Sequence, residues 1–369
     1  MNNYLLFYKK LLNYGGAEEL LLKHYNYLID KNKICTIVTF KNSLNLNKKI
    51  NIIEVSNIFG LIYFISKNRF NKIFASSGHI EIFAASILTF NKYYYFIHHP
   101  SSMSFNEYDK YAFNNLKKLK KFLNPKYFNL FTKLKNKIKS FDQIKINFRF
   151  ILSLMALRYA KQTFVLSEYA KKEKKILYNI SSNVASGAIS KIHPFKKKII
   201  VDKKIRIISI SRLDKNKRID KIIKAISLIN NKNIIFDIYG KGDQHNVLLN
   251  LINRLKLNEQ VFLRGFLNNL DKQSIFSNYD FCICVDFADF RITSIESINF
   301  SCPVILSSDT NLYENNYYDF IKICHPNVMD IKLFLSNIHN VKVNWSNRNF
   351  FLNKYLWKNY FKKIDEYSI

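Results

Sequence analysis

Residues 205–243, IRIISISRLDKNKRIDKIIKAISLINNKNIIFDIYGKGD, contain the clearest pattern of the chain. The runs IRIISI (205–210) and IIFDIY (234–239) are typical of buried strands. Between them, residues 217–230 place five isoleucines on one helical stripe: Ile219, Ile222, Ile223, Ile226 and Ile229. Short strands that alternate with helices predict an α/β fold with a parallel sheet covered on both faces.

The same alternation extends in both directions along the chain. Downstream, we expect helices near 245–256, 271–278 and 293–300, and strands at 261–263, 281–285 and 303–307. Upstream, we expect helices at 17–30 and 80–90, and strands at 4–8, 34–40, 51–55, 72–76, 93–97 and 163–167. The chain has 369 residues, which is enough for two domains of ordinary size. We therefore predict two Rossmann-like, doubly wound domains that face each other across a cleft, at 1–195 and 203–345, followed by a C-terminal helix at 346–369 that returns to the first domain.

The chain is strongly basic. Lys and Arg number 58 against 27 Asp and Glu, a formal net charge of +31. Such a charge suits a polyanion, an anionic membrane surface or a phosphorylated substrate. Because Lys, Asn, Ile, Phe and Tyr are abundant and glycine is scarce, an AT-rich genome explains part of the excess.

The five cysteines and the apolar runs bear on the compartment. The cysteines have no metal-ligand spacing, so we expect reduced thiols. The N-terminal run is too short for a signal peptide, and no stretch approaches the roughly 18 to 20 apolar residues of a spanning helix. The expected location is the cytoplasm, with peripheral attachment to a membrane open.

A basic segment at about 112–150 interrupts the α/β alternation. From Lys117 to Arg149 there are ten Lys and one Arg against one acid, Asp142. Leucines and aromatics recur there at helical spacing, as in helices that lie on anionic membranes. We predict an amphipathic insert that contacts the inner-membrane surface through Lys117, Lys118, Lys120 and Lys121. A solvated basic face on helices of the domain is the alternative.

Three turns that follow strands carry candidate binding residues. Gly15 and Gly16 follow the first strand, where glycine lets a phosphate approach a helix N-terminus; a tight turn is the alternative. Arg212 and Lys217 flank the turn after IRIISI and can converge on a diphosphate. The turn YGKG (239–242) supplies two of the chain's eight glycines.

Thr293 and Glu296 permit two interpretations. With their spacing of three, they have the form of a capping box, in which Glu296 reaches back to the Thr293 backbone N–H. A ligand role for Glu296 is the second interpretation, and the local pattern by itself favours the cap. The local sequence leaves both roles open.

Several motifs, in this order along the chain, resemble those of retaining glycosyltransferases of family 4 (glycosyl transferases group 1), which have the GT-B fold. They are GGAE (15–18), FIHHP (96–100), TFVLSEYAKK (163–172), SRLDKNKRID (211–220), IYGKGD (238–243), VFLRGFL (261–267) and SIESINFSCPVILS (294–307). The resemblance covers nearly the whole chain and includes a closing aromatic and basic helix at 350–367.

The resemblance implies a role for each matching residue. Arg212 and Lys217 match the pair that holds the diphosphate of a nucleotide-sugar, and Glu296 matches the acid that binds the ribose. Gly265 and Phe266 match the turn beside the base. We expect further donor contacts from the same loops and from the N-terminal glycine turn, at Gly15, Gly16, Gly240, Asp289, Arg291, Ile292 and Thr293. His98 matches a histidine near the transferred sugar, with His99 a weaker candidate and a structural loop histidine the alternative.

The chain departs from the family at the first acid of the Glu-x7-Glu pair. Ala288 stands eight residues before Glu296, and Asp289 and Arg291 replace small residues. Either Asp286 or Asp289 substitutes from a shifted loop, or the first acid is missing.

The implied function is a retaining, metal-independent glycosyltransferase without a cofactor. Its donor would be a nucleotide-sugar and its acceptor a glycan or lipid-linked precursor of lipooligosaccharide, capsule or O-antigen. A nucleotide-sugar epimerase and a catalytically degenerate member of the family are the alternatives. A nucleic-acid binder is disfavoured because only the charge suggests one.

Overall fold

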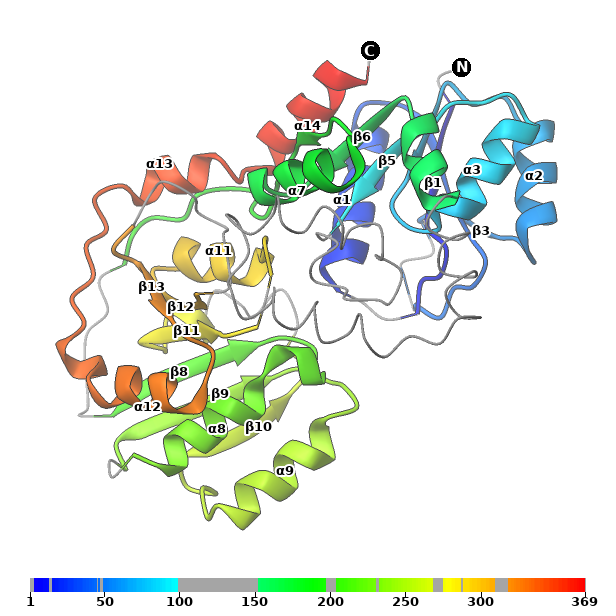
Figure 1. Cartoon of the computed structure of the whole chain (residues 1–369). Coiled ribbons are helices and arrows are strands. Elements are labelled where there is room, and N and C mark those ends of the chain that lie inside the picture. The colour runs from blue at the N-terminus through cyan, green and yellow to red at the C-terminus, as the bar shows by residue number, and fades with distance from the viewer. Residues whose placement is uncertain are drawn as a thin grey trace. The chain divides into compact units, whose positions relative to one another are not determined.

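The computed structural model describes residues 3–12, 15–44, 46, 49–98, 152–196, 204–229, 232–267, 275–286, 288–308 and 318–368. The chain divides into two compact units (Figure 1). Unit 1 comprises Met1–Ser186 together with Tyr360–Ile369, and unit 2 comprises Gly187–Asn359.

Unit 1 is built on a seven-stranded parallel sheet in the order β3-β2-β1-β4-β5-β6-β7. The strands are β1 (Asn3–Phe7), β2 (Ile34–Thr39), β3 (Ile52–Glu54), β4 (Lys72–Ala75), β5 (Tyr94–Ile97), β6 (Gln162–Val165) and β7 (Asn183–Val184). The helices are α1 (Gly16–Asp30), α2 (Ile58–Lys67), α3 (His79–Leu88), α7 (Glu168–Tyr178) and most of α14 (Trp357–Tyr367). Residues 152–159 are also helical.

Different groups of side chains pack on the two faces of this sheet. Leu5 and Phe7 of β1 point into a buried cluster that includes Leu61 of α2 and Ile82 of α3. On the opposite face, the ring of His24 from α1 lies against three aromatic rings, those of Phe74, Phe96 and Phe361. Burial lowers the pKa of His24 to about 3, so this histidine is a neutral core residue.

Unit 2 is built on a six-stranded parallel sheet in the order β10-β9-β8-β11-β12-β13. The strands are β8 (Ile205–Ile210), β9 (Ile234–Tyr239), β10 (Val261–Gly265), β11 (Phe281–Cys284), β12 (Val304–Ser307) and β13 (Ile321–Cys324). The helices are α8 (Ile219–Ser227), α9 (His245–Arg254), α11 (Ile292–Asn299), α12 (Val328–Ser336) and α13 (Arg348–Asn353), with short 3₁₀ turns η2 (Lys215–Lys217) and η4 (Ile338–Asn340).

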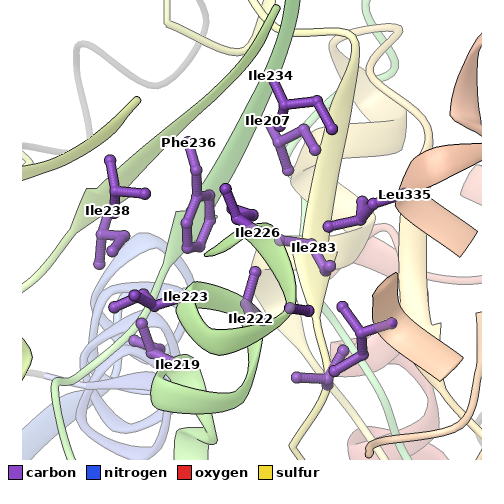
Figure 2. Close-up of a cluster of buried hydrophobic side chains, with 14 of the residues drawn as sticks. Ile207, Ile219, Ile222, Ile223, Ile226, Ile234, Phe236, Ile238, Ile283 and Leu335 are labelled. Atoms are coloured by element: carbon purple, nitrogen blue, oxygen red, sulfur yellow. The ribbon is translucent and has the colours of Figure 1, made fainter. Parts of the chain in front are cut away.

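The isoleucine stripe of α8 forms the centre of the unit 2 core (Figure 2). Ile219, Ile222, Ile223 and Ile226 are at most 3% exposed, and they pack on strand residues such as Phe236. Each fully buried aliphatic side chain stabilises the fold by roughly 1.5–3 kcal/mol. The helical period of the sequence therefore identified the face that attaches α8 to the sheet.

The predicted fold class is confirmed: both units are α/β with parallel sheets. Helix α2 is absent from the sequence prediction, because IFGLIYFISK is apolar around most of its circumference and rich in residues that also favour strands. The helix expected near 271–278 falls partly outside the described residues, since 271–274 are not among them. The five cysteines are free and buried.

Candidate functional site

The order in which the chain adds strands to the sheet of unit 2 reverses between β8 and β11. From β8 the chain builds outward through β9 and β10, and it then returns to place β11 on the other side of β8. In open parallel sheets, ligands bind at the carboxyl ends of the strands at such a switch point. The loops that leave β8 and β11 here are residues 211–218 and 285–291. They contain four of the predicted donor residues: Arg212, Lys217, Asp289 and Arg291.

The loop after β8 is shaped by two local features. The Asp214 side chain caps the 3₁₀ turn η2 by accepting a hydrogen bond from the Asn216 backbone N–H at 3.0 Å. Arg218 then adopts a left-handed backbone conformation, with φ of 55°, between η2 and α8. Its guanidinium donates to the Val285 backbone oxygen at 3.0 Å, which ties this loop to the loop after β11.

An ion-pair cluster joins the same two loops. Lys217 Nζ lies 2.9 Å from Asp286 Oδ2, and Arg291 Nε donates to Asp286 Oδ1 at 3.0 Å. The Asp286 carboxylate is buried, and burial alone raises the pKa of such a group. The charges of Arg291 and Lys217 and the hydrogen bonds they donate outweigh burial, and they lower the pKa of Asp286 to about 2. Asp286 is therefore ionised in the folded protein at neutral pH.

The two predicted diphosphate ligands differ in how firmly they are held. The Arg212 side chain is 66% exposed, and its Nε lies 3.9 Å from Asp214 Oδ2. Lys217 is 28% exposed and is held by Asp286. Of the two cations, Lys217 is the one fixed at the switch point, and Arg212 extends toward solvent.

The glycines after β9 and β10 fasten the neighbouring loops together. Gly240 has φ of 147°, and a Cβ there would lie 1.8 Å from the Ser211 backbone oxygen. A Cβ on Gly242 would lie 2.3 Å from the Leu213 backbone oxygen. The Gly240 N–H donates to the Gly265 oxygen at 2.7 Å, and the Leu213 N–H donates to the Lys241 oxygen at 2.9 Å. Gly240 and Gly242 are therefore explained by the close approach of the neighbouring backbone, which supports the loop that carries Arg212.

The turn at the end of β10 is open to solvent. Gly265 has φ of 75°, and a Cβ there would meet no atom within 4 Å. Phe266 is exposed, and the Lys241 ammonium lies 5.6 Å from the centre of its ring.

The capping-box interpretation of Thr293 is wrong. Helix α11 begins at Ile292 with Arg291 as its N-cap, so Thr293 already lies inside the helix. Thr293, Ile292 and Glu296 are half-buried on α11. Glu296 is thus not explained as the acid of a capping box.

The residues around the missing acid are buried. Ala288 and Asp289 are 5% and 3% exposed, and Arg291 is 8% exposed. Asp286 is likewise buried, at 5% exposed, and its carboxylate is bonded to two cations. The sequence left three possibilities open, a substitution by Asp286, a substitution by Asp289 or the absence of a first acid. It could not show the contact between Asp286 and Lys217, because the tertiary fold brings these two residues together.

Unit 1 has a switch point of its own, between β1 and β4. Gly15 is the N-cap of α1, and Gly16 is the first residue of that helix. Lys9, after β1, forms an ion pair with Glu81 in the first turn of α3. His98 directly follows β5 and is half-buried. The predicted residues of this unit thus lie at the carboxyl edge of its sheet.

Several sequence predictions lie outside the described residues. They concern His99 and the basic insert at 112–150, including Lys117, Lys118, Lys120 and Lys121. In the described part of the chain, no helix is long and apolar enough to cross a membrane. Within those same residues, no group of three or more His, Cys, Asp or Glu side chains is arranged to hold a metal ion.

Solved structures with the same architecture are numerous. The apo form of the lipopolysaccharide outer core galactosyltransferase WaaB superposes with a TM-score of 0.70 at 12% identity, over 100% of this chain and 99% of the other. Anabaena HepE in complex with UDP superposes with a TM-score of 0.73 at 14% identity, over 99% of both chains. The fold is that of the GT-B glycosyltransferases. A glycosyltransferase from Rickettsia africae has this GT-B fold at 17% identity and a TM-score of 0.71, over 99% of this chain and 97% of the other.

Sequence comparison adds a family match for part of the GT-B chain. Residues 190–316 match the family model "Glycosyl transferases group 1". This segment includes the loops after β8, β9, β10 and β11 and all of α11. The GtfA subunit of the UDP-N-acetylglucosamine–peptide N-acetylglucosaminyltransferase from Streptococcus parasanguinis is 31% identical over 98 residues, which is 26% of this chain. The match spans only 19% of the length of that relative.

The sequence missed two other features that support the site. Arg348 of α13 is buried and donates to the backbone oxygens of Ile298 and Asn299 at the end of α11, the first at 3.0 Å. Asp237, buried in the middle of β9, accepts hydrogen bonds from Arg264 and from the Tyr279 hydroxyl. The residues that Arg348 and Asp237 contact are distant from them in sequence, so no local pattern could have identified these hydrogen bonds.

Proposed function

We propose that this protein is a retaining, metal-independent glycosyltransferase that moves a sugar from a nucleotide-sugar to a glycan or lipid-linked acceptor. The observation that carries the proposal is the convergence of Lys217, Arg291 and the start of α11 at the β8/β11 switch point, inside the segment that matches the glycosyl transferases group 1 model. Cations and helix N-terminal amides at one sheet edge suit a diphosphate leaving group.

In this proposal the residues have distinct roles. Lys217 and Arg212 bind the diphosphate and stabilise the negative charge that develops when the anomeric C–O bond breaks. Glu296 binds the ribose, and the turn at Gly265 and Phe266 receives the base. Transfer proceeds on one face of the sugar without a covalent enzyme nucleophile, since the departing phosphate oxygen accepts the proton of the acceptor hydroxyl. His98 contacts the transferred sugar and Gly16 contacts the phosphates, as the resemblance implies.

The acceptor proposal draws on the relatives and on charge. HepE structures contain UDP and UDP-glucose, and WaaB acts in the lipopolysaccharide outer core. By analogy, we propose a role in lipooligosaccharide, capsule or related surface-glycan synthesis, at the cytoplasmic face of the inner membrane. Binding to anionic vesicles that is lost at high salt, and lost when Lys117, Lys118, Lys120 and Lys121 are neutralised, is the expected result.

A donor screen tests the enzymatic proposal. Thermal stabilisation across UDP-, GDP-, ADP- and CMP-sugars selects the nucleotide, and sugar transfer to lipid-linked acceptors, with the anomer of the product read by NMR, tests retention. Lys217→Ala and Arg212→Ala each lower nucleotide affinity by about 10- to 150-fold, because a hydrogen bond to a charged group contributes about 1.5–3 kcal/mol.

Lys224→Ala is the matched control for this screen. Lys224 is a half-exposed cation on α8 that pairs with Asp220 on the same helix at 3.0 Å. Its loss leaves nucleotide affinity unchanged. Full transfer activity in both Lys217→Ala and Arg212→Ala contradicts the diphosphate assignment, and acceptor-free conversion of the donor identifies an epimerase instead.

A further inference from the structure

The Asp286 carboxylate forms an ion pair on each of its oxygens, and the pair with Lys217 joins the two loops of the switch point. Oδ2 accepts from Lys217 Nζ at 2.9 Å, and Oδ1 accepts from Arg291 Nε at 3.0 Å. Arg291 also donates to the Asp286 backbone oxygen. The carboxylate is thus bound to one cation from each loop.

The two cations are not equivalent. The Arg291 side chain is 7% exposed at the N-cap of α11, and it contacts both the side chain and the backbone of Asp286. The Lys217 side chain is 28% exposed at the end of a three-residue 3₁₀ turn. A lysine has a long flexible stem, so an unpaired ammonium at this position samples many rotamers. Asp286 therefore immobilises Lys217, whereas Arg291 is already fixed by its burial.

We propose that Asp286 is a positioning residue, which holds the Lys217 ammonium at the β8/β11 switch point before a nucleotide-sugar arrives. This inference rests on the proposed function, because it takes Lys217 as a ligand of the diphosphate. An ammonium carries three N–H donors, so Lys217 can hold Asp286 and a phosphate oxygen at the same time. A diphosphate then meets a cation already in place, and less entropy is lost on binding.

A competing electrostatic effect decides the sign of the prediction. The negative charge of Asp286 by itself weakens the attraction for a diphosphate, and its removal could strengthen binding. Arg291 offsets that charge on the same carboxylate, so the cluster of three charges keeps a net charge of +1. Once Asp286 is neutral, Arg291 repels the ammonium, and Lys217 moves away because it is the more exposed of the two. Loss of the carboxylate therefore weakens diphosphate binding.

Calorimetric titration with inorganic pyrophosphate and with UDP tests the proposal in the full chain. Asp286→Asn lowers the affinity for both by about three- to tenfold, as expected when one long side chain must be immobilised on binding. Asp286→Glu, which retains a carboxylate, recovers part of the affinity. Asp280→Asn is the matched control: Asp280 accepts from the Arg206 backbone N–H at the opposite end of β8, so its substitution leaves both affinities unchanged.

Two double variants separate positioning from damage to the fold. Asp286→Asn leaves the buried Arg291 without its carboxylate, whereas Asp286→Asn with Arg291→Gln removes both charges. The double variant regains thermal stability but not affinity. In a Lys217→Ala background, Asp286→Asn has no further effect, because Asp286 acts through Lys217.

Four results overturn the inference. Asp286→Asn binds pyrophosphate as tightly as the wild type or more tightly; the charge-free double variant recovers full affinity; Asp286→Asn weakens binding equally in the Lys217→Ala background; or the wild type binds neither pyrophosphate nor UDP. A failure of sugar transfer with every donor overturns the proposed function alone, since the binding measurements still decide the role of Asp286.

Discussion

Gly240 is the position where adding a single methyl group tests how the proposed donor site is built. Its φ of 147° lies in a region that residues with a Cβ rarely adopt, and a Cβ there would lie 1.8 Å from the Ser211 backbone oxygen. Real Cβ contacts are essentially never closer than 3.0 Å. Because the obstructing atom belongs to the backbone, Gly240→Ala forces the loop after β8 away from the loop after β9.

The cost of this displacement can be worked from its parts. A backbone residue held in a sparsely populated region costs about 1–3 kcal/mol. Displacing the loop also weakens backbone hydrogen bonds that join it to its neighbours, those of the Ser211 N–H at 3.0 Å and of the Leu213 N–H at 2.9 Å. Each such bond contributes about 1 kcal/mol. Gly240→Ala should therefore destabilise the fold by about 3–5 kcal/mol, the sum of these contributions.

Gly265→Ala is the matched control, since Gly265 also has a positive φ but a Cβ there meets no atom within 4 Å. It bears the conformational cost alone, about 1–2 kcal/mol. Urea unfolding with a constant m-value measures both free energies, and UDP titration measures the effect on the Arg212 loop. If Gly240→Ala destabilises no more than Gly265→Ala, or leaves UDP affinity intact, the role assigned to the backbone contact is wrong.

Three further predictions concern buried groups. His24→Leu removes a histidine whose pKa is lowered to about 3 by burial. Between pH 7 and pH 5 only the unfolded wild-type chain binds a proton at this histidine, so the wild type loses about 2 kcal/mol of unfolding free energy that the variant retains. Equal pH dependence of the two proteins in urea unfolding contradicts this. Tyr279→Phe removes a hydroxyl that donates to Asp237 at 2.8 Å and costs about 1.5–3 kcal/mol in the same assay; a neutral effect shows that the bond contributes nothing. Arg348→Met leaves the carbonyls at the end of α11 without their donor and lowers the unfolding free energy by about 3 kcal/mol. UDP affinity also falls, because α11 carries Glu296. A stability like that of the wild type rules out this anchoring role.

The sequence predicted the elements of unit 2 within a few residues where periodicity was strong. Four of the five isoleucines of the predicted stripe lie on α8, which ends at Ser227, before Ile229. The runs IRIISI and IIFDIY became β8 and β9 without change. It failed where the local pattern was ambiguous. α2 is apolar on most sides. The spacing of Thr293 and Glu296 fits a capping box with Thr293 as the N-cap, but the N-cap of α11 is Arg291, two residues earlier. A local pattern records which backbone conformation is favoured, but not the residue at which it begins.

The glycines illustrate a second limit. The sequence identified the turn at Gly240 as glycine-rich, and the family resemblance implied a donor contact there. The structure places a neighbouring backbone where the Cβ would stand, at Ser211. Whether a glycine makes room for a ligand or for another loop depends on what lies opposite, and the sequence does not record that.

The sequence alone determined the α/β class, because the periods of its apolar residues are properties of each segment. It also determined which cations flank the strand ends, since Arg212 and Lys217 lie beside β8 in the chain itself. Only the tertiary structure decided which acid meets which cation. Asp286 is 69 residues from Lys217, and the two come within 2.9 Å because β11 is placed beside β8 at the switch point of the sheet. Strand order depends on the packing of the whole unit, so the ion pairs at the proposed donor site follow from the fold and not from any one motif.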